Sequence, residues 1–248
     1  ELSDQIAHAN LCGFGKSVIQ AVLEGKVEQL VLVNCCDSMR RVYDIVESTG
    51  KCKFLYMLDM PHEDNDCEKV KLAQGIHRLK KAYEKFSGKT FDRSGFLNAF
   101  SHEPVDNQPY IGVLGVRVSG ILEKMIRDNI RMDVENLTCT GGRRLAVIRE
   151  ELEKMEDDAM FLAYADALLS QMPCFRMNNS TRRNRLYLDP NLKGIIYHTI
   201  KFCDYYGFEY ASIKRDIKVP LLKIETDFTS QSAGQLLTRV QAFAETLE

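Results

Sequence analysis

Short apolar runs alternate with longer stretches of helical periodicity along the chain of 248 residues. Such runs are typical of strands that are buried on both faces, and the helices between them must cross over the sheet. The fold class is therefore α/β, with parallel sheets and helices on both faces. The predicted strands are 30–34, 54–58, 110–116, 132–137, 194–198 and 220–226, and the predicted helices are 14–23, 37–48, 64–100, 119–129, 144–170, 204–214 and 231–248.

The pattern falls into two domains. Residues 1–100 are expected to form an N-terminal α/β domain with a charged helical segment, and residues 110–248 a C-terminal α/β domain. The segment 101–109 between them has two prolines and little apolar content, so we predict a linker there. The first domain has only two strands, which is few for a sheet, and the chain begins at Glu1 rather than at Met. We therefore expect that the N-terminus is truncated.

The charge balance limits the classes of partner. The chain has 33 basic and 35 acidic residues, a net charge of -2, which argues against non-specific nucleic-acid binding. No apolar run approaches the roughly 20 residues that span a bilayer, and the first residues lack a signal-peptide pattern. We expect a cytoplasmic protein that binds neither nucleic acid nor membrane.

The chain contains eight cysteines, and three explanations compete for them. Disulfides are disfavoured, because a chain of this length without an export signal can form a core without them. A buried structural thiol is the default explanation for any single cysteine. Ligation of a metal is the third explanation, and it requires several cysteines to converge on one place.

Six of the cysteines could converge on one crevice at the carboxyl ends of the strands, where ligand sites occur in parallel sheets. They are Cys12, Cys35, Cys36, Cys139, Cys174 and Cys203, whereas Cys52 and Cys67 lie elsewhere in the pattern. Convergent thiolates suit zinc or an iron–sulfur cluster. The chain has no C-x2-C pair of the kind that zinc knuckles use, which favours a cluster over zinc. Buried structural thiols stay as the alternative.

Other polar motifs are weaker. Gly15-Lys16-Ser17 is similar to the end of a phosphate loop, but Asn10 stands where that loop needs its first glycine. We predict instead that the glycines let the backbone approach a cluster that Cys12 binds.

Two side chains beside the predicted site are candidates for proton transfer. His198 and Glu225 lie near strand ends, although a hydrogen-bonded structural histidine and a helix-capping segment explain them as well. A basic loop is expected either to be solvated or to bind the phosphates of coenzyme A or a partner protein. Its arginines are Arg176, Arg182, Arg183 and Arg185.

Five segments, in this order, resemble the 2-hydroxyacyl-CoA dehydratase family, which includes benzoyl-CoA reductase subunits and double-cubane cluster proteins. They are 34–44, which begins Asn-Cys-Cys-Asp-Ser, then 137–143, 194–204, 219–227 and 234–245. The resemblance implies two flavodoxin- or Rossmann-like domains with an intervening helical segment and an iron–sulfur site between the domains. It also implies that Cys12, Cys36 and Cys203 bind a [4Fe-4S] cluster.

The family also implies partners. In the dehydratases, an iron–sulfur activator protein hydrolyses ATP and drives an electron onto the cluster, which passes it to an acyl-CoA substrate. This chain is then expected to bind ATP only through that activator, and to form a homodimer or pair with a related subunit.

Cys35 departs from the simple dehydratase pattern, because it makes a Cys-Cys pair with Cys36. That pair resembles the double-cubane branch, whose members are similar to ATP-driven reductases of small molecules. Two cubanes that share one sulfide leave six irons for protein thiolates, and Cys35, Cys139 and Cys174 would complete that set in an [8Fe-9S] cluster. We therefore expect an iron–sulfur reductase component. The alternatives are a dehydratase subunit with one [4Fe-4S] cluster and an electron-transfer or scaffold subunit.

Overall fold

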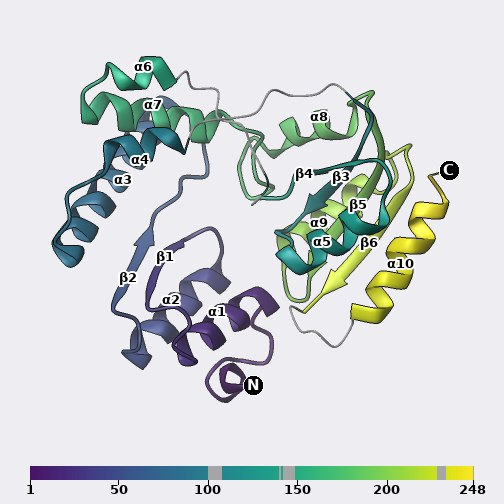
Figure 1. The fold of residues 1–248 in the computed structure, drawn as a ribbon, viewed down its shortest axis with the longest axis horizontal. Helices are drawn as coiled ribbons and strands as arrows, with labels where there is room; N and C mark the ends of the chain where they lie inside the picture. The colour runs from purple at the N-terminus through teal and green to yellow at the C-terminus, as the bar shows by residue number, and fades with distance from the viewer. Residues whose placement is uncertain (100–107, 140, 142–148, 228–232, 248) are drawn as a thin grey trace. The chain divides into compact units, whose positions relative to one another are not determined.

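The computed structural model describes residues 1–99, 108–139, 141, 149–227 and 233–247. The chain divides into two compact units (Figure 1). Unit 1 contains residues 1–9, 15–104 and 144–179, and unit 2 contains residues 10–14, 105–143 and 180–248. The predicted linker at 101–109 lies outside the described residues except for 108 and 109. The segment 144–179, which we expected in the second domain, belongs to unit 1.

Unit 1 contains a parallel pair of strands and a group of helices. The strands are β1 (Gln29–Val33) and β2 (Phe54–Leu58), which pair from Gln29 opposite Phe54 to Val33 opposite Leu58. The helices are the 3-10 helix η1 (Leu2–Gln5), α1 (Gly13–Leu23), α2 (Asp37–Thr49), α3 (Asp66–Ser87), α4 (Arg93–Asn98), α6 (Arg149–Glu153) and α7 (Asp157–Ser170). The first residues of α1 belong with unit 2.

Helix α7 returns the chain to unit 1 because its apolar side chains pack against α3. The shared core contains Leu72, Ala73, Leu97, Leu152, Met160, Phe161, Ala165, Leu169 and Met177. Cys174 packs at the border of this core. The core therefore holds the chain that follows α7 as well as the helix itself.

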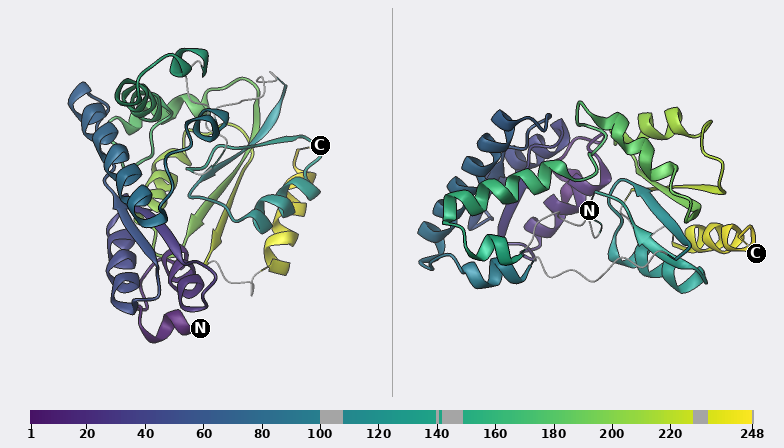
Figure 2. Two further views of the ribbon diagram at one scale, coloured as in Figure 1. Left: turned by 60° about the vertical axis from the view of Figure 1, so that its left-hand side comes forward. Right: turned by 90° about the horizontal axis from the view of Figure 1, so that it is seen from above.

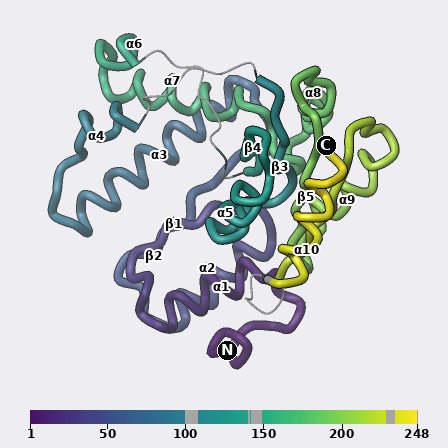
Figure 3. The backbone as a smooth tube through the Cα atoms, turned by 45° about the vertical axis from the view of Figure 1, so that its right-hand side comes forward, coloured from purple at the N-terminus to yellow at the C-terminus, as the bar shows by residue number. Residues whose placement is uncertain are grey.

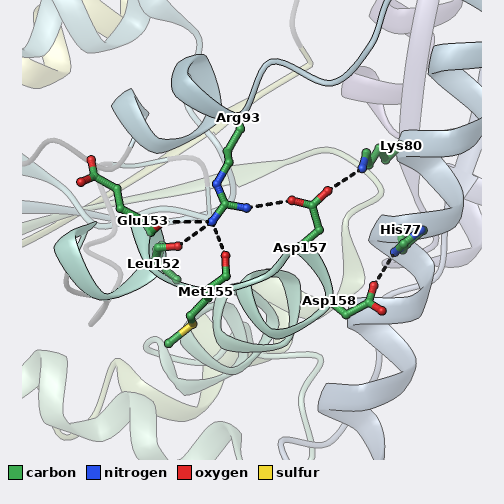
Figure 4. Close-up of polar contacts among 8 residues, drawn as sticks. All are labelled: His77, Lys80, Arg93, Leu152, Glu153, Met155, Asp157 and Asp158. Atoms are coloured by element: carbon green, nitrogen blue, oxygen red, sulfur yellow. Dashed lines mark hydrogen bonds and ion pairs between the residues drawn. The ribbon is translucent and has the colours of Figure 1, made fainter.

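A polar network fastens α6 and α7 to α3 and α4 (Figure 4). Arg93 donates hydrogen bonds to the carbonyl oxygens of Leu152 (2.9 Å), in the last turn of α6, and of Met155, just beyond its end. These carbonyls would accept bonds from the next turn of a continuous helix, so the single helix that we predicted over 144–170 is divided within its described part. Asp157 then begins α7 with Arg93 at 2.7 Å and Lys80 at 2.8 Å. The hydrogen bond from Lys80 is the main cause that lowers the pKa of Asp157.

Unit 2 is built on a four-stranded parallel sheet with the strand order β4-β3-β5-β6. Its strands are β3 (Tyr110–Gly115), β4 (Asp133–Asn136), β5 (Leu192–Ile200) and β6 (Leu221–Thr226). Its helices are α5 (Gly120–Asn129), the 3-10 helix η2 (Ser180–Arg183), α8 (Asn184–Tyr187), α9 (Asp204–Ile213) and α10 (Ala233–Glu245). The chain leaves β3 toward β4 and later returns to the other side of β3 at β5. The order therefore reverses between β3 and β5, which is where doubly wound sheets bind ligands.

Helices cover both faces of this sheet. Figures 2 and 3 show α5 and α10 along the same sheet. Their common core with the strands contains Ile111, Val113, Val118, Leu122, Ile126, Ile130, Val134, Ile196, Ile224, Leu236, Val240 and Phe243. Side chains alternate along a strand, so Tyr197 points to the other face, where its hydroxyl contacts Glu209 of α9.

The predicted α/β class with parallel strands is confirmed in both units. The basic segment 180–187, which we expected to be a loop, contains the short helices η2 and α8. In the part of the chain that the structure describes, no helix is long and apolar enough to cross a membrane.

Candidate functional site

In unit 1, the loops after both strands are tied together just before the cysteine pair. The side chain of Asn34 donates to Asp59 Oδ1 at 2.6 Å and accepts from the Met60 backbone N–H at 2.8 Å. This residue follows β1 and precedes Cys35 and Cys36, while its partners follow β2. The pair is therefore held at the carboxyl edge of the two-stranded sheet, as the sequence predicted.

A third loop of unit 1 joins the same edge and carries Cys174. The Met177 N–H donates to the Cys174 carbonyl at 2.9 Å, which closes a turn. Arg176 lies in that turn, and its Nη2 donates to the Pro61 carbonyl at 2.8 Å. Both Cys174 and Arg176 lie close enough to Cys35 to act on the charge of its thiol. Three of the six predicted ligands thus gather within unit 1.

The cysteine pair is polarised by one hydrogen bond. Cys35 donates to Cys36, and this bond, helped by the backbone N–H groups of Met39 and Ser38 at the start of α2, lowers the pKa of Cys36 to about 6. The same bond, together with burial, raises the pKa of Cys35. Cys36 is the residue that precedes the first turn of α2, where the helix dipole also favours a negative charge. Without a metal, the pair carries one thiolate at neutral pH.

In unit 2, the chain around Cys12 lies against the end of β6. A Cβ added at Gly13 would lie 2.2 Å from the Asp227 carbonyl oxygen, so only glycine permits this approach of the two backbones. The glycine that we assigned to a close backbone approach thus meets the residue that follows β6. Cys12 itself is buried.

Cys203 follows the neighbouring strand β5. A tight turn, in which the Cys203 N–H donates to the Ile200 carbonyl at 3.0 Å, ends the strand, and Phe202 adopts a φ of 65° within it. That φ is strained for a residue other than glycine. Cys203 immediately precedes α9, as its N-cap residue. Because Ile200 pairs with Thr226, Cys12 and Cys203 belong to adjacent strand ends of the same sheet.

Cys139 lies at the same edge of the sheet but at its border. It is exposed in the turn after β4, which is separated from β5 by β3. Cys52 lies at the opposite, amino end of β2, where its Sγ contacts the Phe54 carbonyl oxygen at 3.2 Å. Cys67 is exposed in the first turn of α3. The structure thus separates the last two from the strand ends.

His198 is fixed by two hydrogen bonds in unit 2. Its ring is 1% exposed, with Nε2 at 2.9 Å from Thr226 Oγ1 and Nδ1 at 3.2 Å from the Val116 carbonyl oxygen. Burial lowers its pKa, so the ring is neutral at pH 7. These are the contacts of a structural histidine. Glu225 is exposed and accepts a bond from Thr199 at 3.4 Å.

The basic loop is not a uniformly solvated surface. Arg183 is 1% exposed and pairs with Glu209, which is also 1% exposed and receives bonds from Tyr187 and Tyr197. Arg176 is 7% exposed, and only Arg185 of the four arginines is classed as exposed. Burial of two arginines was not visible in the sequence, because their partners lie 26 and 115 residues away.

Another arginine, Arg117, was not a candidate site residue in the sequence analysis. It lies beside the Cys12 segment. The Arg117 guanidinium stacks 4.5 Å from the centre of the Phe14 ring, and both residues belong to unit 2. Arg117 follows β3, next to the point where the strand order reverses. The one sequence feature that could have indicated Arg117 is its position directly after a predicted strand.

The cysteines have the donor chemistry of an iron–sulfur site, because thiolates are the usual protein ligands of such clusters. Among the described residues, no three His, Cys, Asp or Glu side chains gather as ligands of one ion. The cysteines of a cubane instead each bind a different iron, and the cluster sulfurs accept hydrogen bonds. Unit 1 offers a stabilised thiolate at Cys36 and an Arg176 whose Nη1 is buried and has no hydrogen-bond partner among the described residues.

Comparisons with known proteins indicate the family of this chain. The family model for the 2-hydroxyglutaryl-CoA dehydratase D-component matches residues 1–104 and 105–247. The putative dehydratase subunit YjiM of Escherichia coli (strain K12) is 28% identical over 153 residues, 58% of this chain and 39% of YjiM. The (R)-phenyllactyl-CoA dehydratase beta subunit of Clostridium sporogenes is 40% identical over 57 residues, 22% of this chain and 15% of that subunit.

The aligned part of the chain thus spans well under half the length of these two relatives. The family match, in contrast, extends over both units. The chain therefore belongs to the 2-hydroxyacyl-CoA dehydratase family.

Proposed function

We propose that this chain is the iron–sulfur component of an ATP-activated reductase similar to double-cubane cluster proteins. Cys12, Cys36 and Cys203 would hold a [4Fe-4S] cluster, which is the cofactor type generally associated with the family. The observation that carries the proposal is the gathering of Cys35, Cys36 and Cys174 on hydrogen-bonded loops at one sheet edge.

The number of thiols supports two cubanes rather than one. Two cubanes that share a bridging sulfide need six thiolates, and three thiols in unit 1 with three in unit 2 supply that number. Cys35, Cys139 and Cys174 would complete the [8Fe-9S] set. Cys139 has the weakest geometric support, since it follows the border strand β4.

When bound, the cluster would supply electrons at low potential to a small substrate or an acyl-CoA. The residues of this chain would hold the cluster, balance its charge and limit the access of water. We propose that the electrons come from an ATP-hydrolysing iron–sulfur activator, and that the chain works as a homodimer or with a related subunit. Proton transfer by His198 or Glu225 stays a prediction.

A second candidate is a dehydratase subunit with one [4Fe-4S] cluster. The names of both relatives favour it, because each is called a dehydratase subunit. In that case Cys36 would bind iron, and Cys35 would donate its hydrogen bond to the Cys36 sulfur instead of binding iron itself. An electron-transfer or scaffold subunit without its own substrate is the third candidate.

Iron and acid-labile sulfide, measured on anaerobically purified or reconstituted protein, separate these candidates. We expect about eight irons per chain for a double cubane and about four for a single cubane. Cys35→Ala should halve the iron content in the first case and leave it unchanged in the second. Cys67→Ala is the matched control, because Cys67 is exposed in α3 and away from the strand ends.

Absence of iron from the wild-type chain under these conditions would refute both cluster proposals. To separate a reductase from an electron carrier, the loaded protein is mixed with activator, ATP and a reductant. Turnover of a small reducible substrate supports the reductase, and turnover of a 2-hydroxyacyl-CoA supports the dehydratase.

A further inference from the structure

Arg176 occupies an unusual position for an arginine. It is 7% exposed, yet within the described residues no carboxylate lies within ion-pair distance of its guanidinium. Its Nη2 donates to the Pro61 carbonyl at 2.8 Å, whereas its Nη1 is buried without a hydrogen-bond partner in that same part of the chain. A buried charge in this state is costly, so a group outside the polypeptide is the natural counterpart.

The turn that carries Arg176 is held on both sides. The Asn178 N–H donates to the His62 carbonyl at 2.9 Å, and His62 Nδ1 lies 3.1 Å from the Arg176 carbonyl oxygen. Together with the bond to Pro61, these contacts fix the guanidinium to the loop that follows β2. Hydrogen bonds to backbone groups of unit 1 therefore fix the position of the Arg176 guanidinium.

The fixed charge lies beside the candidate ligands. Arg176 acts on the Cys35 thiol through space, and Cys174 is two residues before it in the same turn. A cluster bound by these thiolates carries negative charge, and reduction adds one more. A nearby buried cation stabilises the reduced state more than the oxidised state, because electrostatic interactions are strong where water is excluded.

We propose that Arg176 is the internal counter-charge of the cluster, and that its free Nη1 donates to a cluster or ligand sulfur and thereby raises the reduction potential. This inference rests on the proposed function, since it requires that the cysteines of unit 1 bind a cluster. Arg176 would be a positioning residue that acts on the cofactor, without contact with substrate. The same role explains why an arginine is buried here without a carboxylate.

The test uses the full chain, reconstituted with iron and sulfide under anaerobic conditions. We would compare the wild type with Arg176→Met, which removes the charge in a similar volume, and Arg176→Lys, which keeps it. Arg185→Met is the control, because Arg185 is an exposed arginine in α8, away from the turn that carries Arg176. Each protein is assayed for iron content and for the midpoint potential of the cluster by a redox titration followed by electron paramagnetic resonance.

We expect the midpoint potential of Arg176→Met to be more negative than that of the wild type, with Arg176→Lys between them and Arg185→Met unchanged. Equal potentials in wild type and Arg176→Met, at equal iron content, would refute the role of Arg176 alone. A wild type that takes up no iron would refute the proposed function itself. If Arg176→Met does not fold, Arg176→Gln, which keeps a donor for the Pro61 carbonyl, allows the same comparison.

Discussion

Removal of the buried carboxylate of Glu209 should destabilise unit 2 strongly. Glu209 accepts from Arg183 through both oxygens, with Nη2 at 3.1 Å from Oε2, and from the hydroxyl of Tyr187 at 3.0 Å and that of Tyr197. The two charged side chains are each 2% exposed. Glu209→Gln keeps the volume but leaves the Arg183 charge uncompensated in the core.

The magnitude follows from this burial. Breaking a buried ion pair by removing one partner costs about 3–5 kcal/mol. For a chain of this size, that cost lowers the Tm by roughly 6–20 °C. The double variant Arg183→Met with Glu209→Gln should recover part of the loss, because no unpaired cation remains and the amide oxygen still accepts from a tyrosine hydroxyl.

The assay is thermal and urea unfolding of the metal-free chain, followed by circular dichroism. Asp128→Ala is the control, because Asp128 pairs with Lys124 at 2.7 Å in an exposed position of α5, where such a pair contributes about 0.5 kcal/mol or less. If Glu209→Gln costs no more than Asp128→Ala, the buried pair does not stabilise unit 2. A double variant less stable than Glu209→Gln would likewise contradict the assignment of the cost to the unpaired Arg183.

Three further predictions follow from single positions. In the metal-free chain, the rate of alkylation of Cys36 should be half-maximal near pH 6. Cys35→Ala should move this midpoint to higher pH, because it removes the hydrogen bond to Cys36. An unmoved midpoint would contradict that hydrogen bond. Folding lowers the pKa of Cys36 from 9.0 to about 6, so the thiolate adds to the free energy of unfolding. This contribution is complete above pH 9 and is lost as the pH falls through about 6. Gly115→Ala should lower the unfolding free energy by at least about 1 kcal/mol, since its φ is 93° and a Cβ would lie 2.1 Å from a backbone oxygen of β5. Gly120→Ala, with open space around it, should be nearly neutral in the same melt. Asp157→Asn should cost about 1 kcal/mol or less at pH 7. Because folding lowers the pKa of Asp157 below 3.8, the difference from wild type should be full above pH 3.8 and should be lost only as the pH falls through the lower, folded-state pKa, which melts at a series of pH values would check.

The strands other than β4 were predictable because each contains a short apolar run. The run 194–198 predicted β5, and the structure extends it to Leu192–Ile200 because both neighbouring strands pair with it. The break between α6 and α7 was not predictable, since it depends on Arg93, which lies 59 residues before Leu152. The inclusion of 144–179 in unit 1 has the same cause: the apolar face of α7 matches α3 in space, and periodicity does not reveal which surface a helix will cover.

The position of the cysteines followed from one rule, that parallel strands place their carboxyl ends at one edge. That rule led from the sequence to Cys35, Cys36 and Cys203, each of which follows a strand. It did not predict how Cys174 reaches the same edge as Cys35, because Cys174 follows a helix and is brought there by Arg176 and Asn178.

The arginines of the basic segment show why charge alone does not indicate a surface. Arg183 and Arg185 are two residues apart, yet one is buried against Glu209 and the other is exposed. Arg176 differs from both, since it is buried and donates to the Pro61 carbonyl oxygen, with no carboxylate in ion-pair distance among the residues that the structure describes. Glu209 explains the burial of Arg183, whereas the proposed cluster would supply the anion beside Arg176. The two arginines thus differ in their partners, which the number of basic residues does not reveal. This difference is the reason to look for a cluster beside Arg176 and not beside Arg183.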